Sequence, residues 1–258
     1  MRDNNFSAAP AAKPEETAVP FTRFESYEDL CRAIVEEILC ALSKKPDLLL
    51  CIAAGHTSLG VFAGLKEAVN SGRADFSRAA FVAMDEWQEM SVHTPGSCGA
   101  FLKESFLNGV NFKPENIRLF DGTAEDGQGE CAAVEDFITQ RGGLDYLVLG
   151  SGMNGHLALN EPGTFFDSRA HVTALDPVSA VVGQKYFENG AELTGGLTLG
   201  IASFREAGRS VLMITGEHKR EICQKILTGP IDPAVPATAV REFSNAAIFC
   251  DRAAGGWQ

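Results

Sequence analysis

The stretch DLLLCIAAGHTSLGVFAGLKEAV, residues 47 to 69, joins a short apolar run to a glycine and then to a helical pattern. A continuously apolar run ending in glycine is typical of a strand covered on both faces, and the segment after it predicts a helix. This alternation recurs along the chain and predicts an α/β fold with a Rossmann-like, mostly parallel sheet, helices on both faces and a single domain. Further strands are expected at 79–87, 116–122, 144–152, 171–176, 196–201, 210–216 and 246–251, and further helices at 97–107, 125–140 and 216–227.

The beginning of the chain predicts a leader followed by a helix. Residues 1–24 are rich in Ala, Pro and charge near their start and are expected to be poorly ordered, so we place the domain at 25–258. From Ser26 to Leu42, apolar residues recur every four positions, which indicates an amphipathic helix. Ser26 is suited to cap this helix, and Asp29 in its first turn suits the helix dipole.

Charge and cysteine usage restrict the partners and the compartment. A formal net charge of −12 argues against binding to nucleic acid or to an anionic membrane. No apolar run reaches the ~20 residues that a membrane span needs. The seven cysteines are scattered, with no CxxC pair, which is typical of reduced thiols in a cytoplasmic protein.

Three segments with chemically active side chains follow predicted strands directly. They are AAGHTS at 53–58, MDEW at 84–87 and GSGMNGHLALNEPG at 150–163. Parallel sheets bind ligands beyond the carboxyl ends of their strands, so these segments are expected to meet at one edge.

Each of the three segments suggests a role in proton transfer or anion binding. The turn at 53–58 opens a helix with hydroxyl residues, which suits a phosphate group. Asp85 follows a fully apolar run, and desolvation there would raise its pKa toward that of a general base. His156 and Glu161 lie among glycines that allow a ligand to approach closely. They lack the spacing and the third ligand of a zinc site, and no GxSxG elbow supports a serine nucleophile, so acid-base chemistry without a metal is expected.

The chain resembles the glucosamine-6-phosphate deaminase (isomerase) family, of which galactosamine-6-phosphate deaminase/isomerase is a close variant. The resemblance extends from about residue 26 to 252, and its strongest motifs are DEW at 85–87, GMNGHLALNEPGTFFDSR at 152–169, LTLGI at 197–201 and TGEHK at 215–219. Trp87, where a tyrosine is more usual, is more similar to the galactosamine-type members. The resemblance implies a phosphorylated amino sugar as substrate, its isomerisation with loss of ammonia, no cofactor and a homo-oligomer.

The same resemblance implies roles for individual residues. Asp85 would move the proton between carbon 2 and carbon 1, and His156, oriented by Glu161, would assist opening of the sugar ring. Asn154 would belong to this catalytic group, and Glu86 and Gly155 would contact the sugar. The implied phosphate ligands are Gly55, His56, Thr57, Ser58, Lys185 and Lys219.

The sequence departs from the family pattern at three places. Asn154 stands where many members have aspartate; its amide can accept a hydrogen bond from the imidazole but cannot stabilise imidazolium by charge. His56 and Ser58 replace a smaller residue and a proline in the phosphate turn. His171 and Thr173 occupy positions that are basic in members activated by an N-acetyl sugar phosphate, so no such activation is expected.

Two other functions compete with the deaminase interpretation. Related 6-phosphogluconolactonases share the fold, although NEPG and DEW argue against that activity. A non-catalytic sugar-phosphate sensor is the second alternative, because related folds serve as effector domains of transcription regulators. Such a regulator needs a DNA-reading element, and too few residues precede the first helix to form one. The sequence leaves open whether the substrate has the gluco or the galacto configuration.

Overall fold

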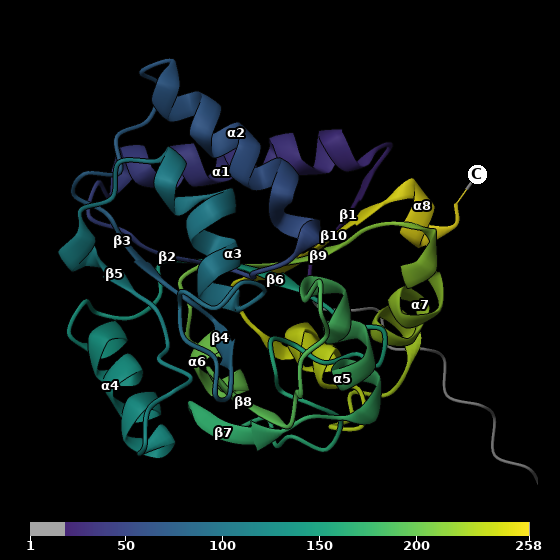
Figure 1. Cartoon of the computed structure of the whole chain (residues 1–258). Coiled ribbons are helices and arrows are strands. Elements are labelled where there is room, and N and C mark those ends of the chain that lie inside the picture. The colour runs from purple at the N-terminus through teal and green to yellow at the C-terminus, as the bar shows by residue number, and fades with distance from the viewer. Residues whose placement is uncertain (1–18, 258) are drawn as a thin grey trace, which may run out of the picture.

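The computed structural model describes residues 19–257, which fold around a seven-stranded parallel sheet (Figure 1). The strand order is β1-β10-β9-β6-β2-β3-β5, and the expected α/β class with a mostly parallel sheet in one domain is confirmed. A second, three-stranded sheet has the order β4-β8-β7 and is antiparallel. The strands are β1 (Phe21–Phe24), β2 (Leu49–Ile52), β3 (Ala80–Val82), β4 (Asp85–Trp87), β5 (Ile117–Arg118), β6 (Tyr146–Gly150), β7 (His171–Ala174), β8 (Gly195–Thr198), β9 (Ser210–Ile214) and β10 (Ala246–Asp251).

Helices cover both faces of the large sheet. Figure 1 shows α1 and α2 together on one face, and α6 with the small sheet on the other. The predicted cap of α1 is confirmed, since the Ser26 side chain accepts a hydrogen bond from the backbone N–H of Asp29. The α-helices are α1 (Tyr27–Lys44), α2 (Leu59–Asn70), α3 (Cys98–Ser105), α4 (Gly127–Thr139), α5 (Pro177–Gly183), α6 (Ile201–Arg205), α7 (Arg220–Thr228) and α8 (Arg252–Gly255).

The expected single strand at 79–87 is wrong, because the chain changes sheets within it. β3 pairs in parallel with β2 and β5, whereas β4 pairs antiparallel with β8. Both parts are largely buried, so the apolar run carries no sign of the break. The consequence for the site is that Asp85 begins a strand of the small sheet, opposite Thr198.

Part of the expected leader belongs to the sheet. Phe21–Phe24 form β1, which pairs in parallel with β10, so the expectation of poor order is wrong for these four residues. A strand of four residues at a sheet edge gives too short an alternation to be recognised from sequence. Residues 1–18 lie outside the described residues.

The interior of the domain is apolar and densely packed with aromatic rings. Phe62 stacks on Phe106 with 4.8 Å between ring centroids, and Phe81 meets Phe106 edge-on at 5.7 Å. All seven cysteines are free, and all but Cys40 are buried. None of the helices within residues 19–257 combines the length and the apolar composition that a bilayer crossing requires.

Candidate active site

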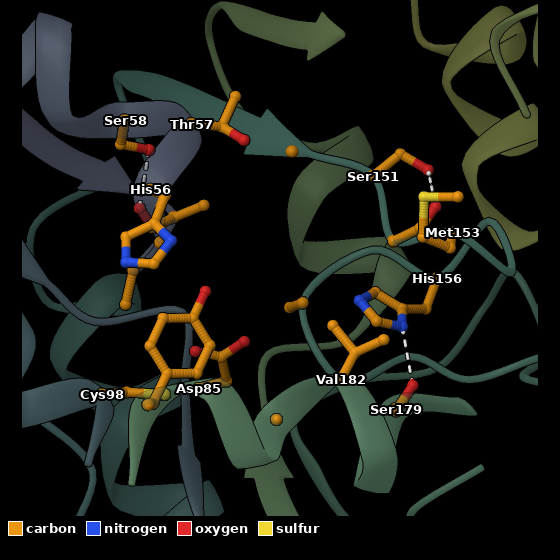
Figure 2. A pocket seen from close by; sticks show the side chains of 18 of the residues that line it. His56, Thr57, Ser58, Asp85, Cys98, Ser151, Met153, His156, Ser179 and Val182 are labelled. Atoms are coloured by element: carbon orange, nitrogen blue, oxygen red, sulfur yellow. Dashed lines mark hydrogen bonds between the residues drawn. The ribbon is translucent and has the colours of Figure 1, made fainter. Parts of the chain in front are cut away.

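A cavity of about 460 Å³ opens at the carboxyl edge of the large sheet. Its lining comes from the turn after β2, from Asp85, from the loop after β6, from α5 and the turn after it, and from the segment after β9. The predicted meeting of the three strand-end segments is confirmed by this cavity. Figure 2 places Asp85 on one wall and His156 on the facing wall.

The turn after β2 is a short 3-10 helix, η1 (His56–Ser58), that leads into α2. Tyr27 of α1 braces this turn, since its hydroxyl donates to the carbonyl of Thr57 and accepts from the N–H of Gly60. The His56 ring packs against that of Tyr186, 5.3 Å away between centroids. Ser58 differs from its expected role, because its buried hydroxyl donates to the carbonyl of Ala53 and is not free for a ligand.

Lys185 and Lys219 reach the same cavity from different parts of the chain. Lys219 ends the 3-10 helix η5 (Glu217–Lys219) before α7, and its ammonium donates to the carbonyl of Ser151. Burial, with a smaller effect from Lys185, lowers the pKa of Lys219 to about 8. Burial also lowers the pKa of Lys185, and among residues 19–257 no carboxylate offsets either shift. Lys185 is exposed and Lys219 is partly buried, and two such cations without an acidic partner form a suitable site for an anion.

Asp85 is a half-buried carboxylate at the start of β4. Burial raises its pKa to about 6, and a hydrogen bond from the Cys98 thiol together with the charge of His156 limits the rise. The sequence predicted this shift from the apolar run before Asp85. At neutral pH the group is ionised yet basic enough to take a proton from carbon.

Glu86 has a structural position rather than the expected contact with a sugar. Its buried carboxylate accepts hydrogen bonds from the backbone N–H groups of Trp87, Cys98 and Gly99, at 2.8–2.9 Å. Two of these donors begin α3, so Glu86 satisfies free donors at a helix N-terminus. Burial raises its pKa to about 7 against the effect of these hydrogen bonds. Glu86 thus holds α3, and with it Cys98, against β4.

His156 is held through its Nδ1 atom by two side chains. Ser179 Oγ lies 2.9 Å from Nδ1, and Glu161 Oε2 lies 3.4 Å from it. Burial would raise the pKa of Glu161, but hydrogen bonds and the charge of His156 outweigh it and keep the pKa below its usual value. Glu161 is therefore an ionised partner of the imidazole, as the resemblance implied.

Contrary to the expectation from the sequence, the side chain of Asn154 does not accept a hydrogen bond from the imidazole. Its side-chain oxygen accepts from the backbone N–H of His156, and its nitrogen donates to Glu161 Oε2 at 3.0 Å. The amide thus orients the acid and the loop rather than the ring itself.

Two glycines determine the shape of the loop that carries His156. A Cβ at Gly152 would lie 2.4 Å from the His156 ring, so only glycine leaves room for the imidazole. Gly155 has φ +87°, and a Cβ there would meet Val235 and Ile222 rather than the cavity. Gly155 therefore shapes the backbone and, contrary to its expected contact with the sugar, is not part of the cavity lining.

Ser179 and His218 are among the residues of the cavity wall that the sequence did not indicate. Ser179 lies in α5, which was not among the expected helices, although Asp176 as N-cap and Pro177 after it are a recognisable helix start. His218 is an exposed residue that lines the cavity beside Lys219. His93 and His171 stay outside the cavity lining.

Within residues 19–257 no three His, Cys, Asp or Glu side chains form a ligand group for a metal.

Residues 22–249 match the family described as glucosamine-6-phosphate isomerases/6-phosphogluconolactonase. The chain belongs to this family. It is 31% identical over 230 residues to the glucosamine-6-phosphate deaminase of Thermoanaerobacter sp. (strain X514), covering 89% of this chain and 91% of the relative. The resemblance inferred from the motifs is confirmed, and the chain is an enzyme by family.

Solved structures extend this similarity to three dimensions. A monomeric glucosamine-6-phosphate deaminase superposes with a TM-score of 0.89 at 29% identity, covering 93% of this chain and all of the other. The 6-phosphogluconolactonase of Thermotoga maritima superposes with a TM-score of 0.70 at 20% identity, covering 90% and 98%. The second match shows a shared fold alone. The implied homo-oligomer stays a prediction.

Asn154→Asp tests the electrostatics around Glu161. It replaces a donor by a second carboxylate beside Oε2, and two adjacent carboxylates raise the pKa of one of them in the folded state. Stability is then lost as the pH rises through that raised pKa, by about 1–2 kcal/mol near pH 8 and by less near pH 5. Thermal unfolding at both pH values, with the exposed Asn245→Asp as control, measures the effect. Equal losses at the two pH values would contradict this assignment.

Proposed function

We propose that the chain converts a 2-amino-2-deoxyhexose 6-phosphate into a ketohexose 6-phosphate and ammonia. The observation that carries the proposal is that one cavity holds Asp85, with its raised pKa, opposite His156, and also two lysines that no carboxylate of the described residues neutralises. A proton-transfer pair beside an anion site suits a phosphorylated sugar. The deaminases among the relatives support the same choice.

Binding would begin at the phosphate. The turn at 55–58, through its backbone and the Thr57 hydroxyl, together with Lys185 and Lys219, would hold the anion at one end of the cavity. Binding energy from this remote group positions the reacting carbons. His56 stands at the same end and can add a contact through its ring. Ser58 would contribute to phosphate binding only through its backbone, because its hydroxyl donates to the carbonyl of Ala53.

Ring opening is assigned to His156. Its Nε2 atom faces the open cavity in Figure 2, while Nδ1 is engaged with Ser179. Nε2 would take the proton of the anomeric hydroxyl and deliver it to the ring oxygen, which breaks the ring carbon–oxygen bond. The product of this step is the open-chain aldehyde with its amine at carbon 2.

Isomerisation and loss of ammonia follow on the open chain. Asp85 would remove the proton from carbon 2, giving an enolamine, and return it to carbon 1, giving a ketose imine. Water then adds to the imine carbon and ammonia leaves, so one water is consumed for each ammonia released. The isomerisation needs only proton transfers, and the carboxylate is suited to them because its pKa lies near the operating pH.

An assay of both epimers tests the proposal directly. The purified chain is expected to release ammonia and ketose 6-phosphate in equal amounts from glucosamine 6-phosphate, galactosamine 6-phosphate or both. A 6-phosphogluconolactone arm, corrected for spontaneous hydrolysis, tests the lactonase alternative that the shared fold raises. Lactone hydrolysis without ammonia release, or tight binding of the amino sugars without turnover, would overturn the proposal in favour of a lactonase or a sensor.

Asp85→Asn should remove turnover while leaving binding. The amide cannot accept the carbon-bound proton, so kcat is expected to fall by about 10³-fold, with affinity for phosphorylated ligands nearly unchanged. In the unmodified chain kcat/KM should rise as the pH increases through about 6, because only the ionised carboxylate is a base. The exposed Asp167→Asn is the matched control. Unchanged turnover in Asp85→Asn would remove Asp85 from its role.

Lys219→Ala should weaken binding more than chemistry. Loss of one charge-assisted contact to the phosphate is expected to raise KM by about 10- to 100-fold with a smaller change in kcat. Affinity of the unmodified chain should also decline above pH 8, where Lys219 loses its charge. Lys225→Ala is the control, because Lys225 lies on the exposed side of α7, the helix that follows Lys219, and is paired with Glu221. A KM equal to that of the control would contradict the assignment.

A further inference from the structure

Ser179 is the nearest side-chain partner of the His156 ring. Its Oγ lies 2.9 Å from Nδ1, closer than Glu161 Oε2 at 3.4 Å, and the contact is drawn in Figure 2. Ser179 is only 3% exposed, so water does not compete freely for its hydroxyl. It stands in the first turn of α5, whose start is fixed by the Asp176 side chain accepting from the N–H of Val178. The serine is therefore rigidly placed beneath the imidazole.

The hydrogen atoms in this cluster can be assigned by counting donors and acceptors. The nitrogen of Asn154 can only donate, and it reaches Glu161 Oε2 at 3.0 Å and Ser179 Oγ at 3.4 Å. Glu161 is an ionised acceptor, buried to 6% exposure, and its Oε1 has no partner among the described residues. The Ser179 hydroxyl is among the groups whose hydrogen bonds lower the pKa of Glu161. Because an ionised carboxylate is a stronger acceptor than a neutral imidazole nitrogen, we assign the Ser179 proton to Glu161.

The imidazole proton follows from this arrangement. If Nδ1 carried no hydrogen, its lone pair would face both a Ser179 oxygen that donates elsewhere and an ionised Glu161 oxygen at 3.4 Å. In that arrangement the lone pair of Nδ1 would be repelled by the lone pairs of both oxygens. With a hydrogen on Nδ1, the ring nitrogen, Ser179 Oγ and Glu161 Oε2 each have a partner of the opposite kind, and Glu161 Oε1 has none among the described residues.

We propose that Ser179 is the positioning residue of His156: it holds the proton on Nδ1, keeps Nε2 bare toward the cavity and links the ring to Glu161. When Nε2 takes a proton from the substrate, the chain Nδ1–H to Ser179 Oγ and Ser179 Oγ–H to Glu161 stabilises the imidazolium without any atom moving far. The charged groups that face His156 are Glu161 on this side and Asp85 across the cavity. Because Asn154 supplies no charge, this link adds to the direct 3.4 Å contact between Nδ1 and the one carboxylate beneath it.

The tautomer of His156 can be measured in the free protein. In ¹⁵N spectra of the unmodified chain with labelled histidine, the neutral ring should show hydrogen on Nδ1 and a bare Nε2. Ser179→Ala should shift the ring to a mixture of tautomers, whereas Ser179→Thr, which keeps the hydroxyl, should retain the Nδ1–H form. Ser203→Ala, another buried serine whose hydroxyl donates to Glu135, controls for loss of a buried hydroxyl. An unchanged tautomer in Ser179→Ala would overturn the proposal.

Turnover gives the second measurement and rests on the proposed function. Ser179→Ala should lower kcat by about 10- to 100-fold with little change in KM, and Ser179→Thr should restore most of the loss. An equal kcat in Ser179→Ala and the unmodified chain would contradict the role of Ser179. Should the alanine variant unfold, Ser179→Cys, of similar size but a weak hydrogen-bonding partner, carries the same test. If the unmodified chain itself releases no ammonia, the proposed function fails, and the tautomer measurement still decides the role of Ser179.

Discussion

The parallel ladder of the large sheet is the constraint on which the site depends. Because β2, β3, β6 and β9 run in one direction, the segments that leave their carboxyl ends emerge at one edge. The turn at 55–58, the loop carrying His156 and the segment carrying Lys219 thereby meet around one cavity. The small sheet adds the remaining wall, since β4 turns out of the ladder and presents Asp85 opposite the histidine loop. The backbone order alone assembles residues more than a hundred positions apart.

Burial then divides the ionisable groups of the cavity by task. It raises the pKa of Asp85 to about 6, so the carboxylate is a stronger base than an exposed one. It lowers the pKa of Lys219 to about 8, because burial disfavours the charged ammonium. Glu161 behaves in the opposite way, because hydrogen bonds and His156 outweigh its burial and keep it ionised. A cavity wall that combines a basic carboxylate with an imidazole held beside an ionised acid is suited to moving protons rather than to nucleophilic attack.

The sequence predicted the sheet class, the meeting of the strand-end segments and the raised pKa of Asp85, since these depend on local apolar runs and on chain direction. It could not predict the change of sheet within 79–87, because both parts of the run are buried and apolar. The predicted contact of Glu86 with the sugar was wrong for a similar reason. Adjacent residues of a strand face opposite sides, and the apolar run before Asp85 and Glu86 did not show which of the two acids faces the cavity. Ser179 was missed because its partner His156 lies 23 positions away and only packing brings them together.

A structure of the chain with an open-chain analogue, a 2-amino-2-deoxyhexitol 6-phosphate, tests the central claim most directly. The account predicts the phosphate at the turn 55–58 within reach of Lys219, carbons 1 and 2 facing Asp85, and His156 Nε2 near the oxygen that closes the ring in the sugar. A phosphate bound outside this turn, or carbons 1 and 2 placed away from Asp85, would contradict it.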